Sequence, residues 1–377
     1  MTPAPASGGR GQVKIVYIAS LGATSTAMAE AIRSTGAEVH TLDKRPYIAW
    51  GGALLSRIQR RLNRGLGLRA FNRDLLRMVE EIRPDVVWVC KGQILHPETI
   101  GRGRRIHDCL WVHENPDDPF GPQRGRHWWK LFYKTLPMFD LHFVPRAVDL
   151  QDYAAAGARR VVRADFVFIP SLHTPPPSGP PRSFECDVAF IGRWEPERHH
   201  AVELLAREGL RVRVWGPFWP KRMRRPPQGV EVRGNGVYGR AYAEAWWKAK
   251  MGLNILTRMN RDLYTVRSFE IPACGCLQLC ERTPEHQAFL EEGTEAEFFD
   301  TWEEMAEKAR HLAEDPARCA EMGLRGAERV RRDGRDAVSK ARRQIDIITE
   351  MLNDRGTAPQ EQPPRDDETP ARERATR

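Results

Sequence analysis

The sequence predicts an α/β protein made of two doubly wound, Rossmann-like domains that face each other across a cleft. The chain has 377 residues, which is enough for two separate hydrophobic cores. Short apolar runs alternate with helical segments, as they do in parallel sheets that are covered on both faces. A proline-rich stretch at residues 169–183 interrupts this alternation, which then starts again.

The first half, residues 12–168, contains a series of apolar runs of strand length. KIVYIAS begins the series, and a helix follows it through Met28 to Ser34. The later runs are AEVHTLD, PDVVWVC, DCLWVHE and LHFVPR. Because glycine, proline or polar turns flank each run, we expect an N-terminal Rossmann-like domain here.

The second half, residues 184–352, repeats the pattern. The strand candidates are CDVAFIG, RVRVWG, VEVRG, MGLNIL, CLQLCE and AEFF. Helices are expected at about residues 197–207, 238–249, 265–273, 302–313 and 317–331. A last helix, at about residues 335–352, is assigned to this second domain, although its pattern also allows packing on the first. Ligands of such sheets bind at the carboxyl ends of the strands.

Composition narrows the class of protein. The net charge of +9 favours anionic partners, such as phosphates, sugar nucleotides, nucleic acid or an acidic membrane. Seven cysteines without a signal-peptide pattern predict reduced thiols and a cytoplasmic protein. No apolar run is long enough to span a bilayer, so a soluble or peripheral protein is expected. Residues 1–11 and 353–377 are predicted to be disordered tails.

The segment FIGRWEPERHH combines a glycine turn with two arginines. Gly192 follows a predicted strand, and Arg193 stands at the carboxyl end of that strand. Arg198 lies in the first turn of the next helix, where free backbone N–H groups add to its charge. This combination suits a diphosphate. The alternative is that both arginines are solvated or paired with Glu195 and Glu197.

The segment TVRSFEIPACGCLQLCE places an acid before a buried strand. Glu270 lies on a short helix that ends at Cys274 and Gly275. A carboxylate in this position can accept hydrogen bonds from both hydroxyls of a ribose. The alternative is a surface glutamate that pairs with Arg267.

Together the two segments resemble the retaining, metal-independent glycosyltransferases of the GT-B class. Members of that class carry a G-R-L-x-x-x-K-like turn, which GRWEPER matches, and an E-A-x-A-C-G-like helix start, which EIPACG matches. The resemblance implies that Arg193 and Arg198 bind the diphosphate of a nucleotide sugar. It implies that Glu270 binds the ribose and that no cofactor is needed beside this co-substrate.

A closer resemblance is to the spore-maturation CgeB-like branch of these enzymes. RSFEIPACGCLQLCERTPE, EEGTEAEFF and, in the first half, WVHENPDDPF carry it, and it covers roughly residues 13–345. AYAEAWWKAKMGLNIL is similar to a segment in which a tyrosine precedes a buried strand, and this adds Tyr242 to the predicted donor site. Gly192 and Arg267 complete that site, while the first domain is expected to bind the acceptor.

One departure from the class concerns a second carboxylate. The class has a glutamate eight residues before the ribose-binding glutamate, and it contacts the donor sugar. Here that position is Asp262, in TRMNRDLYTVRSFE. Either the shorter carboxylate serves, or the role is lost.

The first domain offers further candidates. Gly22, in SLGATST, is expected to let the backbone approach a phosphate or sugar. In the segment that WVHENPDDPFG matches, the class often places a histidine near the donor sugar, which makes His113 a catalytic candidate. The alternative is a structural histidine at a strand end. Asp117 and Asp118 either bind acceptor hydroxyls, act as a base, or cap a turn.

No metal site is predicted. Asp117 and Asp118 are adjacent acids, but no histidine or carboxylate accompanies them at the usual ligand spacing. Cys274, Cys276 and Cys280 lack the C-x2-C spacing of zinc sites, so core packing is expected for them.

The segment LLSRIQRRLNRGLGLRAF reads as a basic amphipathic helix. Its apolar side carries Leu54, Leu55, Ile58 and Leu62, and its other side carries Arg57, Arg60, Arg61 and Arg64. It either contacts an anionic lipid or acceptor, or it is a domain helix with a solvated basic face. KRMRR at 221–225 and GRGRR at 101–105 are read as basic loops. No specific nucleic-acid binding is expected, since the charge is dispersed and no motif is present.

The sequence therefore predicts an enzyme that moves a sugar from a nucleotide-sugar donor to an unknown acceptor, without metal and with retention. Such chemistry needs cations directed at the charge that grows on the leaving diphosphate. The alternatives are a non-catalytic sugar-nucleotide-binding protein of the same fold, or a basic protein that binds nucleic acid or a membrane surface.

Overall fold

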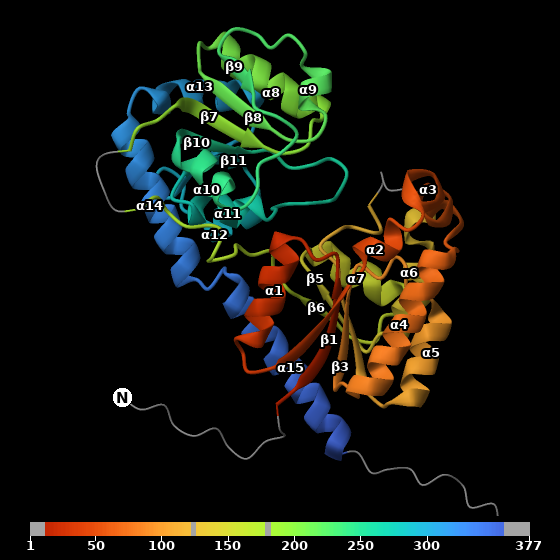
Figure 1. Cartoon of the computed structure of the whole chain (residues 1–377). Coiled ribbons are helices and arrows are strands. Elements are labelled where there is room, and N and C mark those ends of the chain that lie inside the picture. Colours follow the sequence, from red (N-terminus) through yellow and green to blue (C-terminus); the bar gives the residue numbers. More distant parts are fainter. Residues whose placement is uncertain (1–11, 122–125, 178–181, 358–377) are drawn as a thin grey trace, which may run out of the picture.

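The computed structural model describes residues 12–121, 126–177 and 182–357. It contains two parallel sheets, one in each half of the chain (Figure 1). The strand order is β2-β1-β3-β4-β5-β6 in the first sheet and β12-β11-β10-β7-β8-β9 in the second. In both sheets the order reverses direction after the first strands, as in doubly wound folds. The predicted fold class of two doubly wound α/β domains is confirmed.

The first sheet lies between helices on both faces. Its strands are β1 (Lys14–Ala19), β2 (Glu38–Asp43), β3 (Val86–Cys90), β4 (Leu110–Glu114), β5 (Leu141–Val144) and β6 (Val161–Arg163). The helices are α1 (Ala23–Arg33), α2 (Arg45–Ile48), α3 (Gly52–Leu62), α4 (Leu66–Ile82), α5 (Pro97–Ile106), α6 (Lys130–Thr135) and α7 (Ala147–Ala155), with 3-10 turns η1 (Arg126–Trp129) and η2 (Leu136–Met138). Ile15 and Tyr17 pack toward α1, whereas Val16 and Ile18 pack toward α4, as the two-residue period of a strand requires.

The second domain repeats this arrangement. Its strands are β7 (Cys186–Ile191), β8 (Val212–Trp215), β9 (Val230–Val232), β10 (Ala249–Asn254), β11 (Leu277–Glu281) and β12 (Ala296–Phe299). Its helices are α8 (Pro196–Arg207), α9 (Trp219–Arg222), α10 (Arg240–Trp247), α11 (Arg267–Ala273), α12 (Pro284–Phe289), α13 (Trp302–Ala313) and α14 (Pro316–Arg332). Cys274, Cys276 and Cys280 are fully buried, so the predicted core packing of these thiols is confirmed.

The last helix, α15 (Ala337–Thr357), packs on the first domain and not on the second, to which the prediction assigned it (Figure 1). Ala341, Ile348 and Leu352 join the core that contains Ile15 and Tyr17. An amphipathic helix settles where its apolar stripe is buried, and here that place is the face beside α1. The chain therefore crosses twice between the domains.

Other predicted boundaries differ in detail. Residues 353–357, predicted as tail, continue α15, while residues 1–11 and 358–377 lie outside the described residues. GRGRR at 101–105 is not a loop, because it lies within α5, and KRMRR begins in α9. Residues 178–181 of the predicted linker also lie outside the described residues, and the linker boundary stays a prediction. None of the helices in the described ranges combines the length and apolar character of a bilayer span.

Candidate functional site

A cavity of about 220 Å³ lies at the carboxyl end of β7, and we call it the second-domain pocket. Among the residues that line it are Gly192, Arg193, Tyr242, Arg267 and Glu270. The structure thus brings together five of the seven predicted donor-site residues. The first domain closes the pocket with the first turn of α1 and with the segment that leads to the second domain.

Glu270 is held by two neighbours on the wall of this pocket. The Tyr242 hydroxyl donates a 2.6 Å hydrogen bond to Oε2 of Glu270. The Nε2 atom of His173 lies 3.6 Å from Oε1. Arg267 does not pair with Glu270; it donates to the carbonyl of Ile191 instead. The predicted alternative, a surface ion pair between Glu270 and Arg267, is therefore wrong.

The tautomer of His173 follows from its hydrogen bonds. The backbone N–H of Ile169 donates to Nδ1 of His173 at 2.9 Å. In a neutral ring the proton then resides on Nε2, which faces Glu270. Burial lowers the pKa of His173, and the nearby Glu270 opposes this only in part. Glu270 thus accepts one hydrogen bond, from the Tyr242 hydroxyl, and can accept further ones from a ligand.

Two arginines supply positive charge to the pocket. Arg193 is exposed, and its guanidinium stacks over the Phe218 ring at 4.7 Å. Arg267 is fixed at the carboxyl end of β7 by its bond to the Ile191 carbonyl. Both guanidiniums line the same cavity, so together they can bind a polyanion.

Glycines let two backbone turns that line the second-domain pocket approach each other closely. A Cβ atom at Gly216 would lie 1.8 Å from the carbonyl oxygen of Gly192, and Gly216 has a φ of +147°. No other residue fits there without moving the backbone. The turns after β7 and β8 therefore touch, and this contact shapes the part of the pocket beside Arg193.

Arg198 does not line the second-domain pocket, contrary to its predicted role beside Arg193. Its guanidinium is buried and donates to the carbonyls of Arg193 and Ile255 and to the carboxylate of Glu195. Burial, and then repulsion from Arg267, lower the pKa of Arg198 to about 10. Arg198 therefore stabilises the turn that carries Arg193. Its pairing with Glu195 is the alternative that the sequence left open.

Asp262 also lies elsewhere. Its Oδ1 atom is 2.5 Å from Nη2 of Arg146, and both side chains are buried. A second pair links the domains nearby, because Arg261 binds both carboxylate oxygens of Asp118 at 2.8 and 2.9 Å. Asp262 thus belongs to an ion-pair cluster between the domains, and the geometry gives no support to its predicted contact with a donor sugar.

His113 is fully buried and does not line the second-domain pocket. Its ring stacks on Phe132 at 4.7 Å, and its Nδ1 lies 3.0 Å from Nδ1 of His142. Burial and then the neighbouring His142 lower the pKa of His113 well below its usual value. This geometry is that of the alternative interpretation, a structural histidine at a strand end.

The remaining predicted residues of the first domain lie near the cleft. Asp117 forms an ion pair with Lys91 at 2.8 Å. Gly22 is exposed at the start of α1, with a φ of −95° and nothing within 4 Å of an added Cβ, so the fold itself does not require glycine there. Its neighbours Ala23 and Thr24 line the second-domain pocket.

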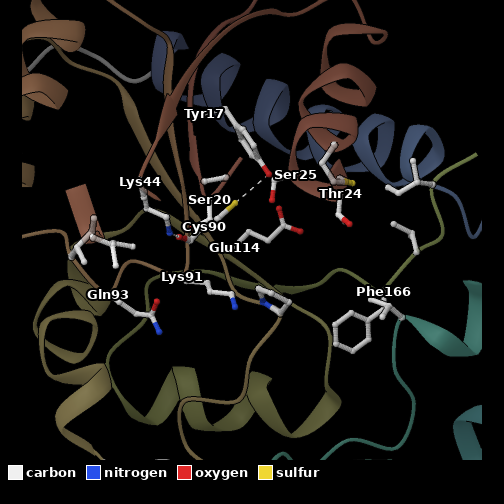
Figure 2. Close-up of a pocket in the computed structure, with 18 of the residues that line it drawn as sticks. Tyr17, Ser20, Thr24, Ser25, Lys44, Cys90, Lys91, Gln93, Glu114 and Phe166 are labelled. Atoms are coloured by element: carbon white, nitrogen blue, oxygen red, sulfur yellow. Dashed lines mark hydrogen bonds between the residues drawn. The ribbon is translucent and has the colours of Figure 1, made fainter. Parts of the chain in front are cut away.

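A larger cavity of about 560 Å³ lies at the carboxyl edge of the first sheet, and we call it the first-domain pocket. Figure 2 shows Lys44, Lys91 and Glu114 gathered around it. Thr24 lines both pockets, so both cavities adjoin the start of α1. The remaining wall is mostly apolar and includes Val266 of the second domain.

The charges of the first-domain pocket do not cancel. Lys91 pairs with Asp117, and Lys340 of α15 pairs with Glu114 at 2.7 Å. The Nζ atom of Lys44 donates to the carbonyl of Cys90 at 2.5 Å, and no ion pair of Lys44 is found within the described residues. Burial lowers the pKa of Lys44 to about 8. One buried cation is left without a carboxylate partner.

Sequence reasoning missed several of these residues. Lys44 follows β2, Lys340 lies on α15, and His173 falls in the proline-rich segment. Only His173 carried a usable signal, as a histidine in the stretch that joins the domains. Within the described residues, no group of three or more His, Cys, Asp or Glu side chains is arranged to hold a metal ion.

Comparisons with known proteins agree with the fold described above. Residues 198–338, less than half of the chain, match the family model described as "Glycosyl transferase-like". No curated protein matches the sequence. HepE from Anabaena, solved in complex with UDP-glucose, is 14% identical, with a TM-score of 0.62, over 91% of this chain and 100% of that chain.

Two further structures have the same fold. A glycosyltransferase from Rickettsia africae is 7% identical over 91% of this chain and 99% of that chain, with a TM-score of 0.61. AviGT4, a glycosyltransferase involved in avilamycin A biosynthesis, is 14% identical over 91% of this chain and 98% of that chain, with a TM-score of 0.56. The predicted GT-B fold and the predicted glycosyltransferase domain are confirmed: residues 198–338 form a glycosyl transferase-like domain in a chain with the GT-B fold.

Proposed function

We propose that the protein transfers a sugar from a nucleotide-sugar donor in the second-domain pocket to an acceptor in the first-domain pocket. The observation that carries this proposal is the carboxylate of Glu270, held by Tyr242 and His173 in the same cavity as Arg193 and Arg267. A ribose site and a diphosphate site are thereby joined in one pocket that opens beside a second one.

Glu270 is suited to hold the ribose. Its Oε2 receives one hydrogen bond from Tyr242, and the ribose hydroxyls would supply the others. Each hydrogen bond to a charged group contributes about 1.5–3 kcal/mol, and a carboxylate left without its donor in a closed site costs a similar amount. The pocket therefore favours ribonucleotides over 2′-deoxyribonucleotides.

Arg193 and Arg267 are suited to bind the diphosphate and to stabilise its growing charge as the glycosidic bond breaks. Their positions are fixed in advance by Phe218 and by the Ile191 carbonyl, so little reorganisation is needed during the reaction. We propose that these two cations serve without a divalent metal. Retention of anomeric configuration stays part of the proposal, on the strength of the motif resemblance alone.

The first-domain pocket indicates the chemistry of the acceptor. Its wall combines apolar side chains with a single unpaired cation at Lys44. An acceptor with an apolar portion and one anionic group would match both properties. Glu114 and Ser20 also line the pocket and would meet the hydroxyls of such an acceptor.

We also propose a place in the CgeB-like branch, on the resemblance of the segments RSFEIPACGCLQLCERTPE, EEGTEAEFF and WVHENPDDPF. HepE was solved with UDP-glucose, which makes UDP-glucose the first donor to test. A cytoplasmic location is proposed on the cysteine content alone.

Calorimetry with UDP and UDP-glucose, with and without EDTA, tests the donor site. We expect binding in the micromolar range, about −8 kcal/mol, and no change on adding the chelator. Slow hydrolysis of UDP-glucose by the same sample would show that the bound sugar is activated. Binding that disappears with EDTA would refute the metal-free site, and tight binding without any turnover on a panel of acceptors would favour the non-catalytic alternative.

A further inference from the structure

Helix α3 turns its polar side toward the domain and its apolar side toward solvent, which is the reverse of a usual amphipathic helix in a soluble domain. Ser56 and Gln59 face the domain and are 7% and 4% exposed. Leu54 and Leu62 face away from it and are 68% and 62% exposed. A helix normally buries its apolar stripe and leaves polar residues in water. The basic side of α3 is solvated, as the domain-helix interpretation expects, but its apolar side is solvated as well.

Leu54, Leu55, Ile58 and Leu62 share one side of α3 by their spacing, and Trp50 and Leu66 are exposed just before and after this helix. We call these six residues the α3 surface. Within the described residues, the other exposed large apolar side chains are dispersed, at Phe218, Tyr238, Leu263 and Leu324. A cluster of this kind marks a binding surface more often than a random feature of a monomer.

Hydrogen bonds fix this orientation of the helix. The Gln59 side-chain amide donates to the carbonyls of Tyr47 and Ile48 at 2.8 and 3.1 Å. Gly51 and Gly52 stand at the start of the helix with φ values of +73° and +79°, which favour glycine. The outward direction of the leucines is thus built into the local fold.

The chain segment that carries this surface has charges of a single sign. Between Asp43 and Asp74 the sequence contains one lysine, seven arginines and no acidic residue. Arg57, Arg61 and Arg64 are exposed beside the apolar residues. Figure 1 shows α3 at the outer edge of the first domain.

We propose that the α3 surface docks the protein on an anionic lipid bilayer. Leucine, isoleucine and tryptophan side chains would enter the interfacial layer, while the arginines would bind lipid phosphates. Such binding needs apolar area and positive charge but no shape-matched partner, and those two properties are what the surface offers. Ile48 and Leu68, which flank the helix, also line the first-domain pocket, so the docking surface adjoins that cavity.

Sedimentation of the full chain with vesicles tests this proposal without reference to enzymatic activity. We expect binding to vesicles of phosphatidylcholine with phosphatidylglycerol, weak binding to phosphatidylcholine alone, and loss of binding at high salt. Arg57→Gln, Arg61→Gln and Arg64→Gln together should weaken binding about 100-fold, since each arginine at an anionic surface contributes roughly fivefold. Leu54→Gln, Ile58→Gln and Leu62→Gln should abolish it.

A matched control removes the same charge elsewhere. Arg207, Arg224 and Arg225 are exposed in the second domain, and their replacement by Gln should leave vesicle binding within about twofold. Leu324→Gln is the apolar control. All variants should keep the wild-type circular dichroism and melting temperature, because they alter exposed side chains.

Three results would overturn the proposal. Equal binding of the arginine variant and the control would show that net charge alone attracts the vesicles. A wild-type dimer that the leucine variant converts to monomer would identify a second copy as the occupant. Binding to single-stranded nucleic acid but not to vesicles would identify the arginines as a nucleic-acid surface.

Discussion

The two pockets differ in how their polar groups are assembled. In the second-domain pocket, Arg193 follows β7 directly, while Arg267 and Glu270 share the helix α11. In the first-domain pocket, Lys44, Lys91 and Glu114 follow or end three different strands, and Lys340 comes from the last helix. Tertiary packing builds both pockets, but two of the three charged groups named in the second-domain pocket share one helix, whereas those of the first-domain pocket each come from a different element.

The cations of the two pockets differ as well. The second-domain pocket takes its positive charge from arginines, and the first-domain pocket takes it from lysines. Burial lowers the pKa of Lys44 to about 8, so its charge is sensitive to mild alkali. The second-domain pocket suits a group that every donor shares, such as a diphosphate. A variable acceptor suits the first-domain pocket, in which single residues set the specificity.

The largest expected effect concerns Asp262, the carboxylate that sequence similarity placed at the donor sugar. Asp262→Asn leaves the buried Arg146 with Asp149 as its remaining close carboxylate. We expect the free energy of unfolding to fall by about 3 kcal/mol, the lower end for breaking a buried ion pair. Nucleotide affinity should change by less than about twofold, because distant sites act independently.

Chemical denaturation and calorimetry on the same variant measure the two quantities. A tenfold loss of UDP-glucose affinity with unchanged stability would contradict the structure. It would mean that Asp262 leaves Arg146 and reaches the donor sugar after all.

The next effect concerns Glu270. Glu270→Gln keeps the shape of the side chain but removes the charge that the Tyr242 hydroxyl and the ribose would share. Affinity for UDP should fall about tenfold to a hundredfold, which corresponds to 1.5–3 kcal/mol. The variant should discriminate less between UDP and 2′-deoxy-UDP than the wild type does.

This double-mutant cycle between protein and ligand isolates the ribose contact. Glu303→Gln, on the exposed face of α13, is the matched control and should bind UDP as the wild type does. Equal affinities of the Glu270 variant and this control would remove Glu270 from the site.

Much of the fold followed from local pattern. Apolar runs predicted eleven of the twelve strands of the described residues and missed β6, and the five helices predicted for residues 197–331 all exist in the structure. The packing of α15 did not follow, since its apolar stripe fits either domain in the sequence. Only the three-dimensional contact of Ala341 and Ile348 with the β1 face decides it.

The contiguous motifs brought most, but not all, of their predicted residues to the second-domain pocket. Arg193, Arg267 and Glu270 come from short segments, and they share a pocket. Arg198 and Asp262 were misplaced because spacing does not reveal burial: each has a buried partner that competes for its charge. Lys44 gave no signal, because its charged and polar neighbours come from separate chain segments.

The smallest effect, and the sharpest contrast between the pockets, concerns Lys44. Octyl sulfate combines an apolar chain with a charge that is constant from pH 6 to 10, so it serves as a probe of the first-domain pocket. Lys44→Met should weaken its binding about tenfold at pH 7, the value of one charge-assisted hydrogen bond. In the wild type, affinity should fall as the pH rises from 7 to 9, because a pKa of about 8 means that Lys44 loses its proton there.

The free energy of unfolding gives an independent readout, because Lys44 makes it rise with pH while the affinity for octyl sulfate falls. The unfolded chain holds the lysine proton up to its ordinary pKa of 10.5, whereas the folded chain releases it at about 8. Between these values the unfolded state binds more protons, so this group makes the free energy of unfolding rise with pH. Lys44→Met should remove that slope together with the pH dependence of octyl sulfate binding, while Lys91→Met should keep both. UDP affinity, which depends on arginines, serves as the control and should be flat from pH 7 to 9 in every variant. A wild type whose affinity for octyl sulfate is also flat over this range would show that the anion does not contact Lys44.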